Sequence, residues 1–199
     1  METKRLIIVA VGGQGNLLAS KVLGEAALIS DIPVQMSEIH GMAQRGGVVE
    51  SAILFGNAKS TIISDGETDI LLGFEPSETL RALNKCSKKT VVITNTSPLP
   101  PFTVGIGIGT YPDLDDLQRL ISEKTARLIA FDASALANQA GNPMSLNMVL
   151  LGALIQIGTL PLSAETIKHA IRSTTKQAFV ETNIKAFDLG YSAAEGAAP

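Results

Sequence analysis

The chain has 199 residues, of which 45% are apolar and 18% are charged, and this balance predicts a globular protein with a well-buried core. The net charge of −3, the low aromatic content and the lack of tryptophan argue against a nucleic-acid surface, which needs a basic patch and stacking side chains. The single cysteine, Cys86, excludes an internal disulfide and any self-contained, cysteine-ligated iron–sulfur cluster.

Two apolar runs bear on the location of the protein. The first, residues 6–11, is too short for the apolar region of a signal peptide. The second, residues 148–162, contains a glutamine and a proline and is too short to span a bilayer. We therefore expect a cytoplasmic protein that makes no contact with a membrane.

The first predicted element is a strand at residues 6–11, where a continuous run of mostly β-branched apolar residues indicates burial on both faces, as in a parallel sheet. A glycine-rich turn follows at once, and apolar residues then recur at helical spacing to about Ser30. The turn consists of Gly12, Gly13, Gln14 and Gly15. A strand, a glycine turn and a helix together direct backbone N–H groups towards an anion, so these four residues are candidates for contact with a ligand or partner.

The same turn nearly matches the dinucleotide fingerprint Gly-x-Gly-x-x-Gly, although its first position is Ala10. Glu38 ends the next predicted strand, where nucleotide-binding folds place the acid that binds the ribose. These residues leave two interpretations open. One is a dinucleotide-binding module, and the other is a tight turn that lets the helix and the strand pack closely.

A second loop follows the predicted strand at residues 34–39 and is dense in functional groups. It combines carboxylate, imidazole, amide and guanidinium groups with three glycines. Its candidate site residues are Glu38, His40, Gly41, Met42, Gln44, Arg45, Gly46 and Gly47. Because each of the two loops follows a strand of a parallel sheet, we expect both to lie at one edge of that sheet, where ligands and partners bind.

The next hundred residues continue to alternate between strand and helix patterns. Strands are predicted at 48–55, with a short partner at 61–63, and at 69–74, 90–94 and 127–131. Helices are predicted at 75–86, 114–124 and 132–139. Residues 95–110 are rich in proline and glycine and are expected to form a loop with a short extended piece at 102–108.

From Asn142 onwards the pattern is helical, with helices predicted at 143–158, 164–172 and 178–189. The first of these is apolar nearly all round, which indicates burial in a core or an interface. The whole chain predicts an α/β fold: a three-layer, Rossmann-like open sheet, mostly parallel, with helices on both faces and a helical C-terminal segment. We expect one domain at residues 1–190 and a mobile tail at 191–199.

A complete catalytic apparatus is not evident in the sequence. His169 lies on a predicted helix without a metal-binding partner at ligand spacing, so we expect it to be at the surface or partly buried. The Gly-x-Ser-x-Gly nucleophile motif is missing, and so is the Gly-Asp-Gly motif of thiamine diphosphate sites. We therefore predict that this chain alone has no catalytic residues and no metal site.

Taken together, the two loops resemble the gamma subunit or gamma domain of the 2-oxoacid:ferredoxin oxidoreductases. The resemblance is carried by the run from Val11 to Gly15 and by the run Glu38-Ile39-His40-Gly41-Met42-Ala43-Gln44-Arg45-Gly46-Gly47. The second run is most similar to the small beta subunit of the indolepyruvate ferredoxin oxidoreductases. The resemblance covers most of the chain and weakens after about Gly190.

The resemblance implies that the whole enzyme converts a 2-oxo acid and coenzyme A into an acyl-CoA, carbon dioxide and reduced ferredoxin. It also implies that thiamine diphosphate, magnesium, iron–sulfur clusters and coenzyme A are held by large partner subunits, and that this chain binds no cofactor. The chain would complete or support the site of such a partner. Arg45 is the best candidate to pair with a carboxylate or phosphate there, and Gln14 and Gln44 would add hydrogen bonds. His40 is either a donor to that site or a partner within the chain.

Two other classes of protein stay open. A stand-alone dinucleotide-binding module would bind NAD(P) or FAD through Gly12, Gly15 and Glu38. A purely structural interaction protein would use its loops only for contacts between subunits. The sequence also leaves open which 2-oxo acid is used, and whether the isolated chain forms a homodimer through its apolar C-terminal helix.

Overall fold

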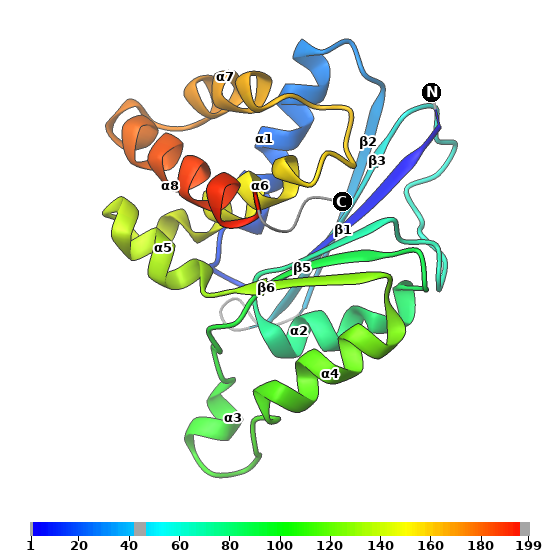
Figure 1. Cartoon of the computed structure of the whole chain (residues 1–199), viewed down its shortest axis with the longest axis vertical. Helices are drawn as coiled ribbons and strands as arrows, with labels where there is room; N and C mark the ends of the chain where they lie inside the picture. The colour runs from blue at the N-terminus through cyan, green and yellow to red at the C-terminus, as the bar shows by residue number, and fades with distance from the viewer. Residues whose placement is uncertain (1, 42–46, 196–199) are drawn as a thin grey trace.

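The structure, a computed structural model, describes residues 2–41 and 47–195 and consists of a six-stranded sheet with helices on both faces (Figure 1). The strands are β1 (Lys4–Val11), β2 (Val34–His40), β3 (Val48–Phe55), β4 (Ile70–Gly73), β5 (Val91–Asn95) and β6 (Arg127–Phe131). Their order across the sheet is β2-β3-β1-β4-β5-β6. The predicted α/β class and open sheet are confirmed.

Strand direction divides the sheet into two parts. Strands β1, β4, β5 and β6 are parallel neighbours, as the sequence predicts. Strand β3 is antiparallel to both of its neighbours, β1 and β2, so β2 and β3 form a hairpin and β2 runs in the same direction as β1. The predicted short strand at residues 61–63 is wrong, because both sides of β3 are already paired and this segment has no strand to join.

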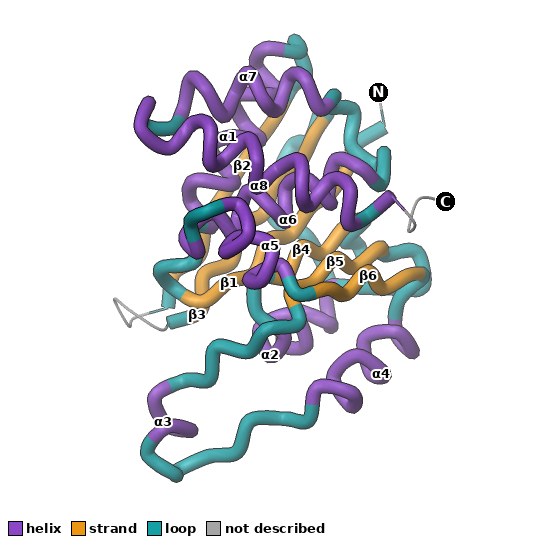
Figure 2. The backbone as a smooth tube through the Cα atoms, turned by 60° about the vertical axis from the view of Figure 1, so that its left-hand side comes forward, coloured by secondary structure: helices purple, strands orange, loops and turns teal. Residues whose placement is uncertain are grey.

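The helices form one thick layer and one thin layer (Figure 2). The thick layer contains α1 (Asn16–Ile29), α5 (Ala133–Ala140), α6 (Leu146–Gln156), α7 (Ala164–Thr174) and α8 (Val180–Ala193), with 3₁₀ turns at Pro143–Ser145 and Gln177–Phe179. The thin layer contains α2 (Pro76–Arg81), the 3₁₀ turn Ala82–Lys85 and α4 (Leu114–Lys124). The predicted three layers are therefore present.

The two layers exist because alternate residues of β1 face opposite sides of the sheet. Leu6, Ile8 and Ala10 are buried in the larger core, and Ile7 and Val9 are buried in the smaller one. The continuous apolar run of β1 thus indicates burial on both faces, as expected for a central strand.

Helix α6 lies at the centre of the thick layer, which explains why its sequence is apolar nearly all round. Every residue from Leu146 to Ile155 is buried. Gly152 and Gly190 let α6 and α8 pack closely, because a Cβ atom at Gly190 would overlap the carbonyl oxygen of Val149. The predicted burial of this helix is confirmed.

Residues 96–112 form an arm that projects from the sheet edge and contains a short helix, α3 (Phe102–Gly105) (Figure 1). The predicted extended piece at 102–108 is therefore wrong. Strand β5 is already paired on both sides, so the following segment leaves the sheet, and Pro101 precedes a helical turn whose first residues accept such a proline.

At the C-terminus, α8 continues to Ala193, and Ala194 is buried in the larger core. The first residues of the predicted tail, 191–193, are therefore helical, while 196–199 lie outside the described residues. Among the residues that the structure describes, no helix is long and apolar enough to cross a membrane.

Candidate functional site

The two loops singled out in the sequence meet at the carboxyl edge of the sheet. Gly12, which follows β1, donates its backbone N–H to the carbonyl oxygen of Gly47 at 2.8 Å, and Gly47 leads into β3. This contact arises because β2 and β1 run in the same direction, so the β2–β3 turn and the turn after β1 share one edge. The predicted convergence of the two loops is confirmed.

The glycine turn is held by its own glutamine. The Oε1 atom of Gln14 accepts a hydrogen bond from the Val11 N–H at 2.8 Å, and its Nε2 atom donates to the carbonyl oxygen of Phe74 at 3.2 Å. Gly13 has a φ of 104°, a conformation that glycine adopts without steric cost. Gln14 therefore joins the ends of β1 and β4, so its predicted role as a donor to a partner competes with an internal one.

Gly15 allows a close contact with the thick helical layer. It caps α1 with a φ of 85°, and an added Cβ atom would lie 2.6 Å from Nδ2 of Asn147. That Nδ2 atom donates to the carbonyl oxygen of Gly15 at 3.1 Å. The glycine at this position is thus explained by packing within the chain, without a ligand.

The hairpin loop is described only at its two ends. Gly41 donates its N–H to the carbonyl oxygen of Val48 at 2.8 Å, which closes the base of the hairpin. Of the candidate residues, Met42, Gln44, Arg45 and Gly46 lie outside the described residues. The predictions made for them stay predictions.

A polar network links the start of α1 to the hairpin. The buried Ser51 hydroxyl lies 3.1 Å from Oδ1 of Asn16 and 3.3 Å from Oε1 of Glu38. The other Glu38 oxygen, Oε2, lies 3.5 Å from Nε2 of His40. His40 thus has a carboxylate partner within the chain, while its side chain remains half exposed beside the hairpin loop.

The place of Glu38 differs from that of a ribose-binding acid. In doubly wound nucleotide-binding folds, that acid ends the parallel strand next to the first strand. Here the neighbour of β1 on this side is the antiparallel β3, and Glu38 lies one strand further out. The carboxylate contacts Ser51 and His40, so the near-match to the dinucleotide fingerprint is not completed by the required strand order.

A cavity of 190 Å³ opens beside the glycine turn, between Gly12 and the N-terminus of α2. Its most buried polar group is the carboxylate of Glu75, which is only 1% exposed. The Oε2 atom of Glu75 accepts from the N–H of Glu78 at 3.0 Å and so caps α2. Its Oε1 atom accepts from the N–H of Leu99 at 3.2 Å and from the Tyr111 hydroxyl.

A second carboxylate, that of Glu78, also lines this cavity. Burial is the main reason why its pKa is raised; Arg81 opposes the shift, at 3.2 Å from Oε1, and Glu75 adds to it. The Oε2 atom is buried and has no hydrogen-bond partner among the described residues. Burial and the Glu75 carboxylate likewise raise the pKa of Tyr111. Sequence analysis missed these acids as site residues and assigned them only to a helix start.

The ends of β5 and β6 add a further polar cluster at the same edge. The buried Asn95 donates from Nδ2 to the carbonyl oxygen of Phe74 at 3.2 Å and accepts the N–H of Ala133 at 3.0 Å. The Ser97 hydroxyl, 2.6 Å from Asp132, and then the Ala135 N–H hold the pKa of Asp132 below its usual range. Sequence analysis missed Asn95 and Asp132 as site residues. Each directly follows a predicted strand, and this position could have indicated them.

Other residues with reactive side chains lie away from this edge. Cys86 is buried, and burial raises its pKa to about 11, so it stays a thiol at neutral pH. His169, expected at the surface or partly buried, is exposed. Within the described ranges, no group of three His, Cys, Asp or Glu side chains is arranged to hold a metal ion.

The fold and the site geometry together define a Rossmann-like α/β domain whose carboxyl edge brings the glycine turn next to the base of the β2–β3 hairpin. Residues 5–193 match the pyruvate ferredoxin/flavodoxin oxidoreductase family, and the chain belongs to this family.

Individual relatives agree with this assignment. The chain is 43% identical to the indolepyruvate oxidoreductase subunit IorB of Pyrococcus horikoshii over 98% of both chains. It resembles the crystal structure of a keto/oxoacid ferredoxin oxidoreductase gamma subunit from Geobacter sulfurreducens, with a TM-score of 0.71 and 26% identity over 97% of this chain and 99% of that one. It also shares its fold with part of a 2-oxoglutarate:ferredoxin oxidoreductase chain from Magnetococcus marinus, with a TM-score of 0.73 at 19% identity over 98% of this chain and 32% of that one.

Proposed function

We propose that this chain is the small, gamma-type subunit of a 2-oxoacid:ferredoxin oxidoreductase that acts on indolepyruvate. The observation that carries the proposal is the end-to-end similarity to a named indolepyruvate oxidoreductase subunit, with 43% identity over 98% of both chains. Similarity of this extent includes both loops and the helical C-terminal layer. It therefore supports a shared role for the whole chain rather than for one motif.

The reaction of the complex is an oxidative decarboxylation. The 2-oxo acid loses carbon dioxide, its acyl carbon forms a thioester with the sulfur of coenzyme A, and two electrons pass to ferredoxin as a proton is released. Thiamine diphosphate supplies the carbanion stabilisation that this chemistry needs. We assign thiamine diphosphate, magnesium, the iron–sulfur clusters and coenzyme A to larger partner subunits. The single, buried Cys86 supports the assignment of the clusters elsewhere.

In this scheme the carboxyl edge of the sheet faces the partner. The Gly12–Gly47 hydrogen bond holds the glycine turn and the hairpin loop together, so one partner surface can contact both. Arg45 would pair with a carboxylate or phosphate at that surface, and Gln44 would donate a further hydrogen bond. The role of the loops is to complete the wall of the partner's site and exclude water there, without a covalent step on this chain.

Affinity purification of the tagged, full-length chain from its native cell tests this function. We expect co-purification of a larger protein that contains thiamine diphosphate and iron, and indolepyruvate-dependent reduction of ferredoxin or a viologen by the purified complex. If the complex oxidised another 2-oxo acid in place of indolepyruvate, the substrate assignment would change to that acid. Recovery of the chain alone with bound NAD(P) or FAD would overturn the proposal in favour of a dinucleotide-binding module.

A further inference from the structure

The arm at residues 96–112 presents apolar side chains to solvent at its tip. Phe102 is 78% exposed and Ile108 is 74% exposed, and Ile106 between them is also exposed. The arm carries no charge, because the sequence has no Asp, Glu, Lys or Arg between residues 90 and 112. Figure 2 shows it extending from the sheet edge with α3 at its far end. Exposed apolar groups gathered on a projecting segment are typical of interaction sites.

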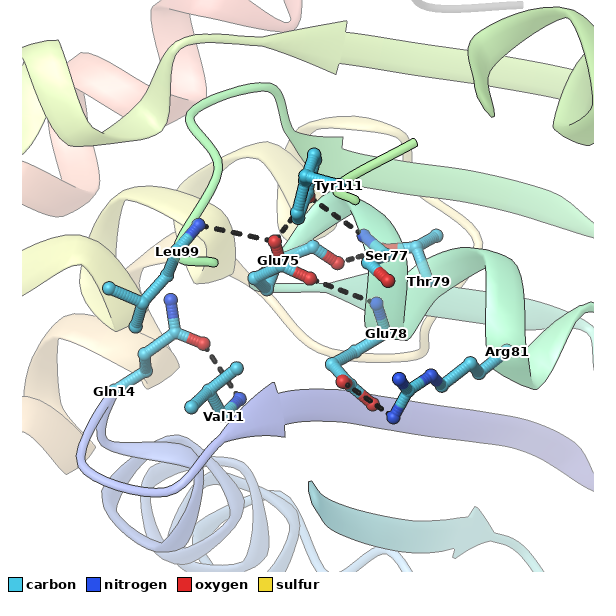
Figure 3. Close-up of polar contacts among 9 residues, drawn as sticks. All are labelled: Val11, Gln14, Glu75, Ser77, Glu78, Thr79, Arg81, Leu99 and Tyr111. Atoms are coloured by element: carbon cyan, nitrogen blue, oxygen red, sulfur yellow. Dashed lines mark hydrogen bonds and ion pairs between the residues drawn. The ribbon is translucent and has the colours of Figure 1, made fainter. Parts of the chain in front are cut away.

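One buried carboxylate, that of Glu75, contacts the arm near both of its ends. The Glu75 carboxylate accepts the Leu99 N–H at one end of the arm and the Tyr111 hydroxyl at the other (Figure 3). The Tyr111 oxygen in turn accepts the N–H of Ser77 at 3.3 Å, which adds a link to α2. Both ends are thus attached to α2, so the arm is held in its projecting position before any partner binds. Such pre-organisation lowers the entropic cost of association.

We propose that this arm is a docking element that inserts its apolar tip into an apolar groove of the larger partner subunit. The inference rests on the proposed function, which supplies the partner. The arm begins beside the cavity next to Gly12, so a partner that covers the glycine turn also reaches the arm. The arm and the site loops then form one continuous interface.

A second copy of this chain is a poorer occupant, because the larger hollows among the described residues all contain charged side chains. Three of the described hollows are larger than the cavity beside Gly12. The largest, 740 Å³ between α1 and β2, is lined by Lys21, Glu25 and Glu38 among others. The second, 560 Å³, combines apolar side chains such as Met144 and Phe179 with one charged residue, Lys176, and the third, 400 Å³, contains Glu181, Lys185 and Asp188. Burying an apolar tip against these charged groups would remove water from them without giving them a partner.

The test compares an arm variant with a control variant elsewhere on the chain. Both replace exposed apolar side chains with serine. The arm variant is Phe102→Ser/Ile108→Ser. The control is Ile62→Ser, because Ile62 is 80% exposed and lies in the segment after β3, at the opposite edge of the sheet. Each tagged chain is purified from native cells, and co-purifying thiamine diphosphate is measured per mole of chain. Hydrogen exchange at residues 99–111 is compared between the complex and the isolated chain.

We expect the arm variant to recover at least about tenfold less thiamine diphosphate than the unaltered chain, as for the loss of an interface anchor. The Ile62→Ser control should recover as much as the unaltered chain. Exchange at 99–111 should slow in the complex. Full recovery by the arm variant, with unprotected exchange, would overturn this inference and leave the proposed function intact. Failure of the unaltered chain to recover thiamine diphosphate would overturn the proposed function itself. A homodimer of the isolated chain that the arm variant abolishes would assign the tip to a second copy.

Discussion

The Nδ2 atom of Asn147 donates a hydrogen bond of 3.1 Å to the carbonyl oxygen of Gly15, although 132 positions separate the two residues in the chain. The contact fastens the glycine turn after β1 to the first turn of the buried helix α6. It makes the shape of the glycine turn depend on a helix that lies far away in the sequence. Two substitutions in the turn separate this packing role from simple backbone strain.

Gly15→Ala should destabilise the fold by about 2–4 kcal/mol, because it adds a Cβ atom 2.6 Å from Asn147 Nδ2 at a residue with a φ of 85°. Gly13→Ala is the matched control, since Gly13 has a φ of 104° but nothing within 4 Å of the added atom, and should cost only about 1 kcal/mol. Urea unfolding of both variants measures the difference. Equal losses would mean that Asn147 moves aside freely.

Glu75→Ala should lower the free energy of unfolding by about 3 kcal/mol, because it leaves the N–H groups of Glu78 and Leu99 and the Tyr111 hydroxyl without their acceptor. Tyr111→Phe removes only one of these bonds and should cost about 1 kcal/mol. Amide exchange should speed up at Leu99 in Glu75→Ala. Unchanged exchange there would show that the carboxylate does not hold the arm.

The stability of the Glu78→Gln variant, compared with that of the unaltered chain, should increase as the pH rises. Burial raises the pKa of Glu78 above its ordinary value of 4.5, so the native state binds this proton more tightly than the unfolded chain. The contribution of Glu78 to stability is therefore present at low pH and is lost as the pH rises through the raised native pKa. Denaturant unfolding of both proteins at about pH 4 and pH 8 gives the difference. A difference that stays constant with pH would contradict the shift.

Arg45→Ala should reduce turnover or assembly of the complex by about tenfold to a hundredfold, as expected for the loss of a charge-assisted hydrogen bond, while the subunit stays folded. Arg45 lies in the part of the hairpin outside the described residues, so this expectation comes from the sequence. Arg172→Ala, at an exposed position of α7, is the control. If Arg45→Ala assembled and turned over as the unaltered chain does, Arg45 would have no role at the interface.

Local sequence patterns identified most elements because their periodicities are set by the backbone itself. The buried strand β1 with its β-branched run and the buried helix α6 were both predicted. The failures at 61–63 and 102–108 share a cause. A short apolar run becomes a strand only where a neighbouring strand offers free hydrogen-bonding groups, and the sequence does not state which edges are free.

By itself, the sequence determined the α/β class, the two loops and their convergence, because alternating strand and helix patterns favour parallel strands, and the loops after parallel strands share one edge of the sheet. The reversed strand β3, the network from Asn16 to His40 and the place of Glu38 were decided only by the tertiary structure. So were the attachment of the arm to Glu75 and the bond from Asn147 to Gly15. Each of these joins residues distant in the chain, and such contacts depend on how the layers pack around a common core rather than on local propensity.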